Sequence, residues 1–168
     1  MADIQTNPNS SVNNRYLSFS LGAEEYGIPL LSVKEVIAMP DFTPIPYTPP
    51  YFLGIMNLRG QVISVMDLRK KFNIKPNPTA ETAVIICDLK SICIGVVVDS
   101  INSVLMPQAD EVSGKPEIHS AQNTDYITGV YRHEKALVLF LDIARTLNGE
   151  DHKAIAQAGG ARDARKAA

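Results

Sequence analysis

The sequence is poor in the features that mark several common classes of protein. Its formal net charge is only −2 over 168 residues, so it offers no broadly basic surface to nucleic acid or to an anionic membrane. No apolar run approaches the ~20 residues that a membrane-spanning helix needs. The polar first residues lack the charged-then-apolar layout of a signal peptide. We therefore expect a cytoplasmic protein that neither binds nucleic acid nor inserts into a membrane.

Residues with which a protein does chemistry are also scarce. The sequence has no phosphate-binding loop, no dinucleotide-binding glycine pattern and no cluster of metal ligands. The histidines His119, His133 and His152 have no Cys or His at ligand spacing, so solvated surface positions are their default interpretation. Ser64 lies within an apolar run and lacks the glycine elbow of a catalytic serine. The sequence thus predicts no enzymatic activity, no cofactor and no metal.

Two cysteines, Cys87 and Cys93, lie on either side of a predicted turn at residues 88–91. Two strands joined by such a turn could bring the thiols together in a cross-strand disulfide. Buried free thiols are the interpretation that we favour, because a reducing compartment keeps cysteines in the thiol form.

What the sequence does contain is one unit in two copies. The copies correspond at an offset of 68 residues and, after seven extra residues that follow Leu105, at an offset of 75: Gly27-Ile28 with Gly95-Val96, residues 33–37 with 101–105, Gly54-Ile55 with Gly129-Val130, and residues 62–68 with 137–143. Each half is near the lower size limit for an independent core. Two such halves predict a paired module with a groove between them, a geometry more typical of protein binding than of catalysis.

The pattern within each half predicts an all-β fold. Short apolar runs alternate with turn signals, and about five strands per half would close a small barrel. We expect residues 1–14 to be disordered, residues 15–148 to form the folded region, and residues 149–168 to be a tail or a frayed helix. The first barrel would cover about residues 15–78 and the second about 79–148. The pattern leaves open whether the terminal strands cross to the other barrel.

Connections and helix ends carry their own signals. Five prolines in residues 39–50 predict a stiff, extended connection rather than a helix or a central strand. Asp67 and Asp142 occupy matched positions, and an acid pair is one interpretation. Since each precedes a short amphipathic stretch, residues 68–72 and 143–147, helix capping explains them better. Asn148-Gly149 should stop the second short helix.

Arg59 is the candidate binding residue that the pattern itself suggests. Arg59-Gly60 should form a tight hairpin turn, and a guanidinium on a rigid turn suits forked hydrogen bonds to a partner's carboxylate or carbonyl groups. A solvated turn arginine is the plainer interpretation of the same pattern. The equivalent turn in the second half, residues 132–135, looks generic by comparison. Glu35, which stands in an apolar run, is matched there by Ser103.

Several of these segments together resemble one known family. They are residues 17–19, 26–29, 33–37, 44–46, 95–101 and 126–130, and above all residues 52–69 with Asn57-Leu58-Arg59-Gly60 in its strand context. In these segments the chain resembles CheW, the coupling protein family of bacterial chemotaxis. The resemblance covers about residues 15–148, which is nearly the whole predicted folded region.

The resemblance implies a fold, a function and two partners. It implies two SH3-like five-stranded barrels packed around a shared hydrophobic core, with short helices. It implies a non-catalytic scaffold, monomeric when free, that is recruited to membrane-associated arrays of methyl-accepting chemoreceptors. Its partners would be the receptor cytoplasmic tips and the regulatory domain of the histidine kinase CheA.

The resemblance also transfers site residues by position. The receptor-binding positions would be Val33, Glu35, Gly54, Asn57, Leu58, Arg59 and Gly60. The kinase-binding positions would be Leu17, Leu30 and Val33. Two alternatives remain: an adaptor of the same fold in a chemosensory pathway for pili or development, and an SH3-like protein that binds nucleic acid, against which the charge argues.

Overall fold

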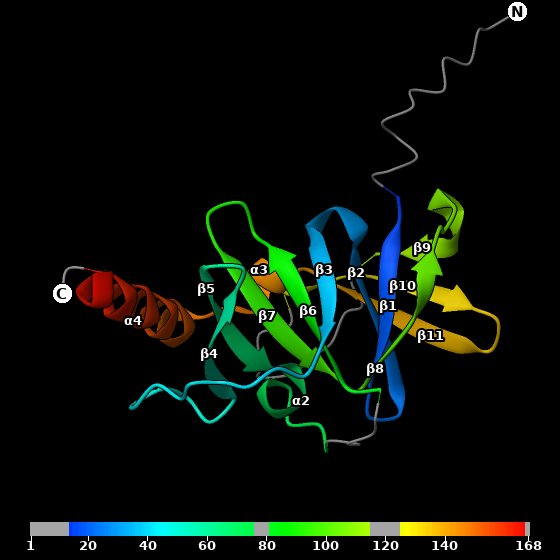
Figure 1. Cartoon of the computed structure of the whole chain (residues 1–168). Helices are drawn as coiled ribbons and strands as arrows, with labels where there is room; N and C mark the ends of the chain where they lie inside the picture. The colour runs from blue at the N-terminus through cyan, green and yellow to red at the C-terminus, as the bar shows by residue number, and fades with distance from the viewer. Residues whose placement is uncertain (1–13, 76–80, 115–124, 167–168) are drawn as a thin grey trace, which may run out of the picture.

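The computed structural model describes residues 14–75, 81–114 and 125–166, and shows two β-sheets that pack on each other with short helices around them (Figure 1). Nearly all of the predicted disordered segment, and the middle of the loop before residue 125, lie outside the described residues. Within the described ranges, no helix is both long enough and apolar enough to cross a membrane.

The first sheet, which we call the first barrel, has the strand order β3-β6-β7-β5-β4. Its strands are β3 (Val33–Ala38), β4 (Phe52–Leu58), β5 (Gln61–Asp67), β6 (Ala83–Asp88) and β7 (Cys93–Val98). The second sheet, the second barrel, has the order β8-β1-β2-β11-β10-β9. Its strands are β1 (Tyr16–Leu21), β2 (Glu24–Pro29), β8 (Ser100–Leu105), β9 (Val112–Ser113), β10 (Ile127–His133) and β11 (Ala136–Leu141). The predicted all-β class with two SH3-like barrels is confirmed.

Within the described residues, four short helical segments and one longer helix connect or flank the strands. They are the 3-10 turns η1 (Leu30–Ser32) and η2 (Ala109–Glu111), the single-turn helices α2 (Leu68–Lys71) and α3 (Ile143–Thr146), and the longer α4 (Gly149–Lys166). Asp67 and Asp142 cap α2 and α3 by accepting hydrogen bonds from the N–H groups of Arg69 and Ala144. The capping interpretation is therefore confirmed.

The barrels are not contiguous halves of the chain, and the expected bounds of 15–78 and 79–148 require correction. The hairpin β1–β2 from the first half belongs to the second barrel, and the hairpin β6–β7 from the second half belongs to the first. In the repeat, β1 and β2 are the equivalents of β6 and β7. Each half of the chain therefore gives its first hairpin to the barrel formed by the rest of the other half. Parallel pairs, β2 with β11 and β7 with β5, join each exchanged hairpin to its host.

Strand registers confirm the repeat residue by residue. Gly27 pairs with Phe140 in the second barrel, and Gly95 pairs with Val65 in the first. These two pairs differ by the offsets of 68 and 75 seen in the sequence. The bulges match as well, with one between Val33 and Glu35 on β3 and its equivalent on β8. The two barrels are thus copies of one design with their first hairpins exchanged.

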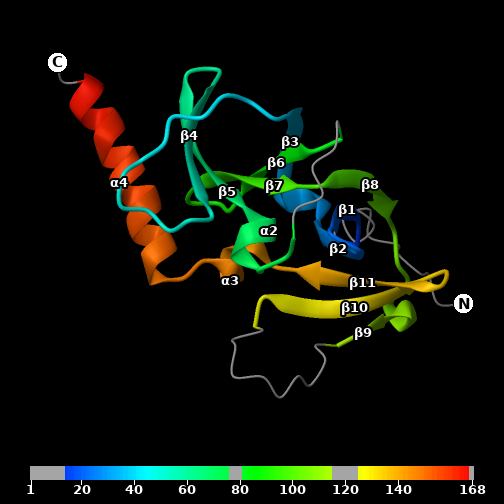
Figure 2. The ribbon, with the colours of Figure 1, turned by 90° about the horizontal axis from the view of Figure 1, so that it is seen from below.

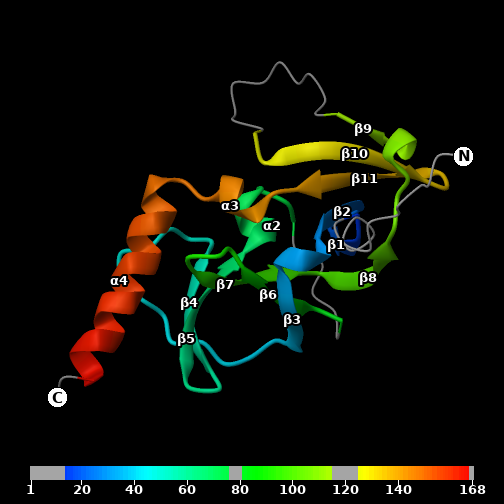
Figure 3. The ribbon, with the colours of Figure 1, turned by 90° about the horizontal axis from the view of Figure 1, so that it is seen from above.

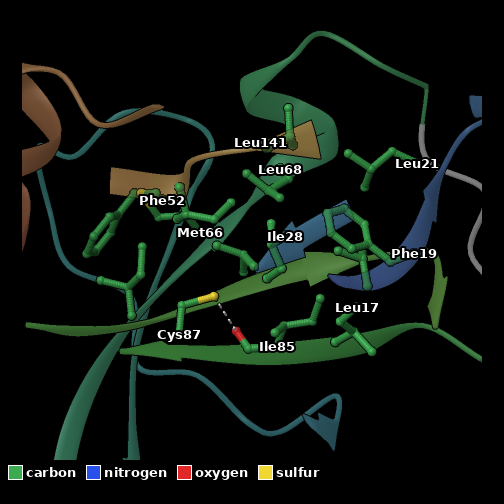
Figure 4. Close-up of a cluster of buried hydrophobic side chains, with 14 of the residues drawn as sticks. Leu17, Phe19, Leu21, Ile28, Phe52, Met66, Leu68, Ile85, Cys87 and Leu141 are labelled. Carbon is green, nitrogen blue, oxygen red and sulfur yellow. Dashed lines mark hydrogen bonds between the residues drawn. The ribbon is translucent and has the colours of Figure 1, made fainter. Parts of the chain in front are cut away.

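One hydrophobic cluster spans both barrels and forms the shared core (Figure 4). Its buried members come from both sheets, from α2 and α3, and from α4: Leu17, Phe19, Leu21, Ile28, Phe52, Met66, Leu68, Ile85, Cys87, Ile94, Val96, Val98, Ile127, Leu141, Ile143 and Ala154. Smaller clusters fill the interior of each barrel. The exchanged hairpins supply many of the shared residues, so the core itself ties the two barrels together.

The two cysteines are free thiols, as we favoured. Cys87 pairs with Ile94 across the β6–β7 hairpin, whereas Cys93 pairs with Asp88. Directly paired residues share a face of a sheet and successive residues alternate, so the two thiols face opposite sides. Burial raises the pKa of the Cys87 thiol to about 12, which leaves it protonated and unreactive.

The sequence predicts two connections between the elements, the proline-rich segment and the link after α3. The proline-rich residues 39–50 form no long element and make a single bridge, between Thr43 and Ile55 on the edge of β4. That prediction is confirmed. Asn148-Gly149, in contrast, does not simply stop α3, because the Asn148 side chain accepts a hydrogen bond from the Asp151 N–H at 3.0 Å and so caps the start of α4.

Candidate partner-binding site

The most specific sequence segment forms a two-residue turn between β4 and β5. Leu58 and Gln61 pair across the hairpin and enclose Arg59 and Gly60. Both central residues have positive φ, 52° at Arg59 and 84° at Gly60. This is the type I′ geometry whose twist matches the flanking strands. Asn57 Oδ1 also accepts a hydrogen bond from the Gly60 N–H at 2.9 Å, so the predicted turn is confirmed and the Arg59 backbone is fixed.

Arg59 and Glu35 form a forked ion pair between the two edges of the first barrel. Arg59 Nη1 and Nη2 donate to Glu35 Oε1 and Oε2 at 2.7 and 3.1 Å. Glu35 lies on β3 and Arg59 follows β4, and these strands are the edges of the sheet. Lys34 Nζ and Gln61 Oε1, 3.5 Å apart, make a second link between the same regions. The fork therefore helps to close the barrel and orients the guanidinium.

The paired guanidinium remains accessible to a partner. The Arg59 side chain is 75% exposed, whereas that of Glu35 is 22% exposed. A pair as exposed as this contributes about 0.2–1 kcal/mol, so a partner's carboxylate or carbonyl can compete for the guanidinium. Large apolar side chains on or beside β3 are also exposed: Leu31, Val36 and Met39. The surface thus offers one fixed, oriented charge beside apolar area.

All seven residues expected to contact receptors lie on β3 or on the β4–β5 hairpin. Six of them are at least partly exposed: Val33, Glu35, Asn57, Leu58, Arg59 and Gly60. The Arg59–Glu35 fork brings these two segments together. Asn57 and Gly60 are exposed with Arg59. Leu58 and Val33 are half-buried against hydrophobic clusters, so each presents only part of its side chain.

Gly54 is the seventh residue, and it has a structural task. It is buried beneath the proline-rich connection, with φ of +138°. A Cβ at this position would overlap the carbonyl group of Thr43, whose backbone bridges to Ile55. Gly54 therefore allows the connection to lie against β4.

The residues expected to contact the kinase are divided in the same way. Leu17 is only 7% exposed and belongs to the shared core. It lies on β1, which has a strand on each side, so its side chain exposes little surface in the free protein, and its contact with the kinase stays a prediction. Leu30 and Val33 are half-buried at the ends of η1. The residue between them that sequence reasoning missed is Leu31, which is 61% exposed.

A buried charge network, also missed from the sequence, supports the first barrel. Arg69 Nε and Nη2 donate to the two oxygens of Asp67, each at 2.9 Å, and Nη1 donates to Asp99 Oδ1 at 2.9 Å. The other oxygen of Asp99 accepts from the Gly22 N–H at 2.6 Å. The hydrogen bonds that Arg69 donates to Asp67 and to Asp99 raise the pKa of its guanidinium above the ordinary value despite burial. The network ties α2 to the β7–β8 link and to the β1–β2 turn.

Nothing else in the described ranges suggests a reaction. Within residues 14–75, 81–114 and 125–166, no group of three His, Cys, Asp or Glu side chains is placed to hold a metal ion. Ser64 is buried in β5, 5% exposed, as an apolar-run residue should be. His133 lies on β10 with Nδ1 3.3 Å from the Tyr131 hydroxyl, and His152 is exposed on α4. His119 lies outside the described residues.

Comparison with known proteins adds three findings to this geometry. Residues 15–151 match the family model described as a CheW-like domain. The chain is 32% identical over 152 residues to the chemotaxis protein CheW of Klebsiella aerogenes, covering 90% of this chain and 92% of that protein. It is 31% identical to CheW of Bacillus subtilis over 137 residues, covering 81% and 88%.

A solved structure agrees with the sequence comparisons. The scaffolding protein TtCheW of Thermoanaerobacter tengcongensis superposes with a TM-score of 0.75 at 27% identity, covering 83% of this chain and 97% of that one. The repeat, the paired barrels and the Asn57-Leu58-Arg59-Gly60 turn all lie within the matched region. The chain therefore belongs to the CheW family.

Proposed function

We propose that this protein is a non-catalytic adaptor that couples chemoreceptors to the histidine kinase CheA in chemotaxis arrays. The observation that carries the proposal is the Arg59–Glu35 fork on a rigid hairpin of the first barrel, in a chain of the CheW family. A fixed exposed guanidinium beside apolar side chains suits recognition of another protein. The adaptor would act in the cytoplasm, at the receptor arrays.

The receptor tip would bind over β3 and the β4–β5 hairpin. An amphipathic helical tip buries its apolar stripe on apolar area, while a few polar contacts set its register. Arg59 and Glu35 would set that register, and Val33, Asn57, Leu58 and Gly60 would line the contact. Charged contacts of this kind contribute more to orientation and specificity than to affinity, and repetition across an array multiplies modest individual contacts.

The kinase regulatory domain would bind beside η1. Leu30 and Val33 are half-buried there and Leu31 is exposed, so they offer a compact aliphatic surface for another barrel. Leu17, the third position predicted to contact the kinase, lies in the shared core. A pulldown with purified kinase regulatory domain and a receptor cytoplasmic fragment tests both partners at once.

Reversing the charge at the hairpin tests the receptor part of the proposal. Arg59→Glu should leave the fold intact, because the residue is exposed, and should abolish receptor-dependent kinase activation in reconstituted arrays. The matched control is Arg132→Glu in the second barrel, at the position that corresponds to Asn57 of the first. This variant should support normal kinase activation. Normal activation by a well-folded Arg59→Glu protein would disprove the proposal.

A double variant separates recognition from closure of the barrel. Glu35→Arg with Arg59→Glu restores an ion pair of reversed polarity between the same two edges. Thermal unfolding should return towards that of the parent protein, while kinase activation should stay lost. Recovery of activation in the double variant would mean that the pair acts only by holding the hairpin.

A further inference from the structure

Helix α4 is fastened to the first barrel by one fully buried carboxylate. Asp151 is 0% exposed. Its carboxylate accepts hydrogen bonds from the Tyr51 hydroxyl, from Lys71 Nζ at 2.6 Å and from the Asn148 N–H at 2.9 Å. Lys71 Nζ also lies 4.4 Å from the centroid of the Tyr51 ring. These partners come from the start of β4, the end of α2 and the α3–α4 connection, so a single side chain joins four elements.

The electrostatics show that this fastening is charged at neutral pH. Burial alone would raise the pKa of Asp151, but Lys71, Tyr51 and the Asn148 N–H outweigh it, and the pKa lies below its ordinary value. Burial, and then the hydrogen bond to Asp151, raise the pKa of Tyr51 to about 12. A buried ion pair whose remaining oxygens are also satisfied is costly to break from one side.

Beyond Asp151, α4 lies along β5. Ala154 and Ala158 are buried, and Ile155 packs against the shared core. A cavity of about 340 Å³ between helix and sheet is lined by Ile155, Ala156 and Ala158 on one side and by Gln61, Val62, Ser64, Ile92 and Cys93 on the other. Figures 2 and 3 show α4 at the β4–β5 end of the molecule, away from β9 and β10. The start of α4 therefore packs on the first barrel, which the expectation of a tail or a frayed helix over residues 149–168 did not include.

The strand that α4 covers begins directly after the candidate recognition turn. β5 starts at Gln61, next to Arg59 and Gly60, and α4 contacts β5. The equivalent hairpin β10–β11 of the second barrel has β9 at its edge and, among the described residues, no helix in the place of α4. The two hairpins therefore also differ in the element that packs against them, which is α4 for β4–β5 and β9 for β10–β11.

We propose that α4 is a brace that holds the β4–β5 hairpin, and with it the Arg59–Glu35 fork, in the geometry that a partner recognises. Asp151 is the positioning residue, because it fixes the start of α4 to β4 and α2. Alanines at the contact keep the helix close to the strand. The effect on partner binding rests on the proposed receptor function, whereas the effect on the hairpin does not.

Hydrogen exchange of the full chain tests the brace without any partner. Asp151→Asn keeps the shape and removes the charge, and the adjacent exposed Glu150→Gln is the matched control. Amide exchange in the Arg59–Gly60 turn and β5 should become at least about tenfold faster in Asp151→Asn, the change that a loss of ~1.4 kcal/mol of local stability produces. Exchange in β10 and β11 should be unchanged, and Glu150→Gln should match the parent protein.

Two outcomes would overturn the brace. Unchanged exchange in β5 would show that α4 does not support the hairpin. An equal increase in both hairpins would show that Asp151 contributes to overall stability alone. If Asp151→Asn does not fold, hydrogen exchange of Ala158→Glu tests the brace instead. A carboxylate at this buried position should push α4 away from β5. Its control, Gln157→Glu, adds the same charge on the exposed side of the same turn.

Binding of a receptor cytoplasmic fragment to the same folded variants tests the consequence for recognition. The dissociation constant should rise about tenfold in the variant whose β5 amides exchange faster, because a hairpin that is less preorganised binds more weakly. Unchanged affinity despite faster exchange would overturn the link between brace and recognition. Failure of the proposed receptor function would give a different result. Arg59→Glu would then activate the kinase normally, while hydrogen exchange in β5 of Asp151→Asn would still be faster.

Discussion

Apart from β9, which only the second barrel has, the first and second barrels share strand order, registers and bulges, yet they carry different groups at equivalent positions. Glu35 of the first barrel corresponds to Ser103, and Arg59 corresponds to Glu134. The residues that the barrels share are those that pack, pair or turn the chain. The residues in which they differ lie on an exposed edge and a turn tip, where the fold makes few demands, and this divergence makes the first barrel the better candidate for partner recognition.

The largest expected difference between the barrels lies beneath the surface, at the two helix caps. Arg69→Met would leave Asp67 and Asp99 buried without their counter-charge, and removing one partner of a buried pair costs about 3–5 kcal/mol. In the second barrel Ala144 stands at the position of Arg69, and the ion pair at that cap, Arg145 with Asp142 at 3.4 Å, is exposed, so Arg145→Met should cost less than about 1 kcal/mol. Urea unfolding of both variants gives the comparison. Similar losses would contradict the distinction between a buried network and a surface pair.

A smaller difference is expected at the equivalent glycines Gly54 and Gly129. Gly54→Ala meets both a positive φ and the Thr43 carbonyl, and we expect a loss of about 2–3 kcal/mol from strain and overpacking. At Gly129 a Cβ would lie 3.0 Å from Val112 Cγ1 without positive φ, and the loss should be about 1 kcal/mol. Thermal unfolding measures both. A larger loss at Gly129 would mean that β9 is held more rigidly than the proline-rich connection.

The smallest expected effect concerns the two hairpin turns. Arg59 and Glu134 both have positive φ, 52° and 56°, which costs a side chain about 1 kcal/mol. Glu134→Gly should therefore stabilise the protein slightly, by up to about 1 kcal/mol. Arg59→Gly gains the same relief but loses the fork to Glu35, worth about 0.2–1 kcal/mol.

The gap between these two glycine variants measures what the ion pair contributes to closing the first barrel. Equal gains in the free energy of unfolding would show that it contributes nothing to stability. In that case Arg59 would occupy a strained position solely for the benefit of a partner, as strained residues at functional sites often do.

Local features could be predicted from the sequence because the signals are local. The Arg59-Gly60 turn, the Asp67 and Asp142 caps and the proline-rich connection each follow from residues within a few positions of one another. The repeat was visible for the same reason, as pairs of short matching segments. These predictions required only the period of a strand, the capping preference and the φ preference of glycine.

The exchange of hairpins could not be predicted, because the repeat makes the alternatives equivalent. A strand's alternation says which face is buried but not which copy of the neighbouring strand it pairs with. β2 and β7 share a glycine followed by a β-branched residue, Gly27-Ile28 and Gly95-Val96, and this match does not say which of the two equivalent neighbours each strand pairs with.

The burial of several side chains could not be predicted from their residue type. Leu17 is an apolar strand residue, and alternation cannot say whether such a side chain faces the core or a partner. Arg69 and Asp151 are charged, which suggests solvent, yet both are buried in ion pairs. The alanines of α4 give almost no hydrophobic signal, because their contribution comes from close approach of the helix rather than from apolar area.

The exchanged hairpins have a mechanical consequence for an adaptor. The arrangement is that of a domain-swapped dimer whose two chains have been joined into one. The first barrel is one continuous stretch of chain, β3 to β7, inserted between β2 and β8 of the second barrel. The chain therefore passes between the barrels twice, and no single cut separates them. A force or a tilt that a partner applies to one barrel reaches the other through two covalent links as well as through the shared core.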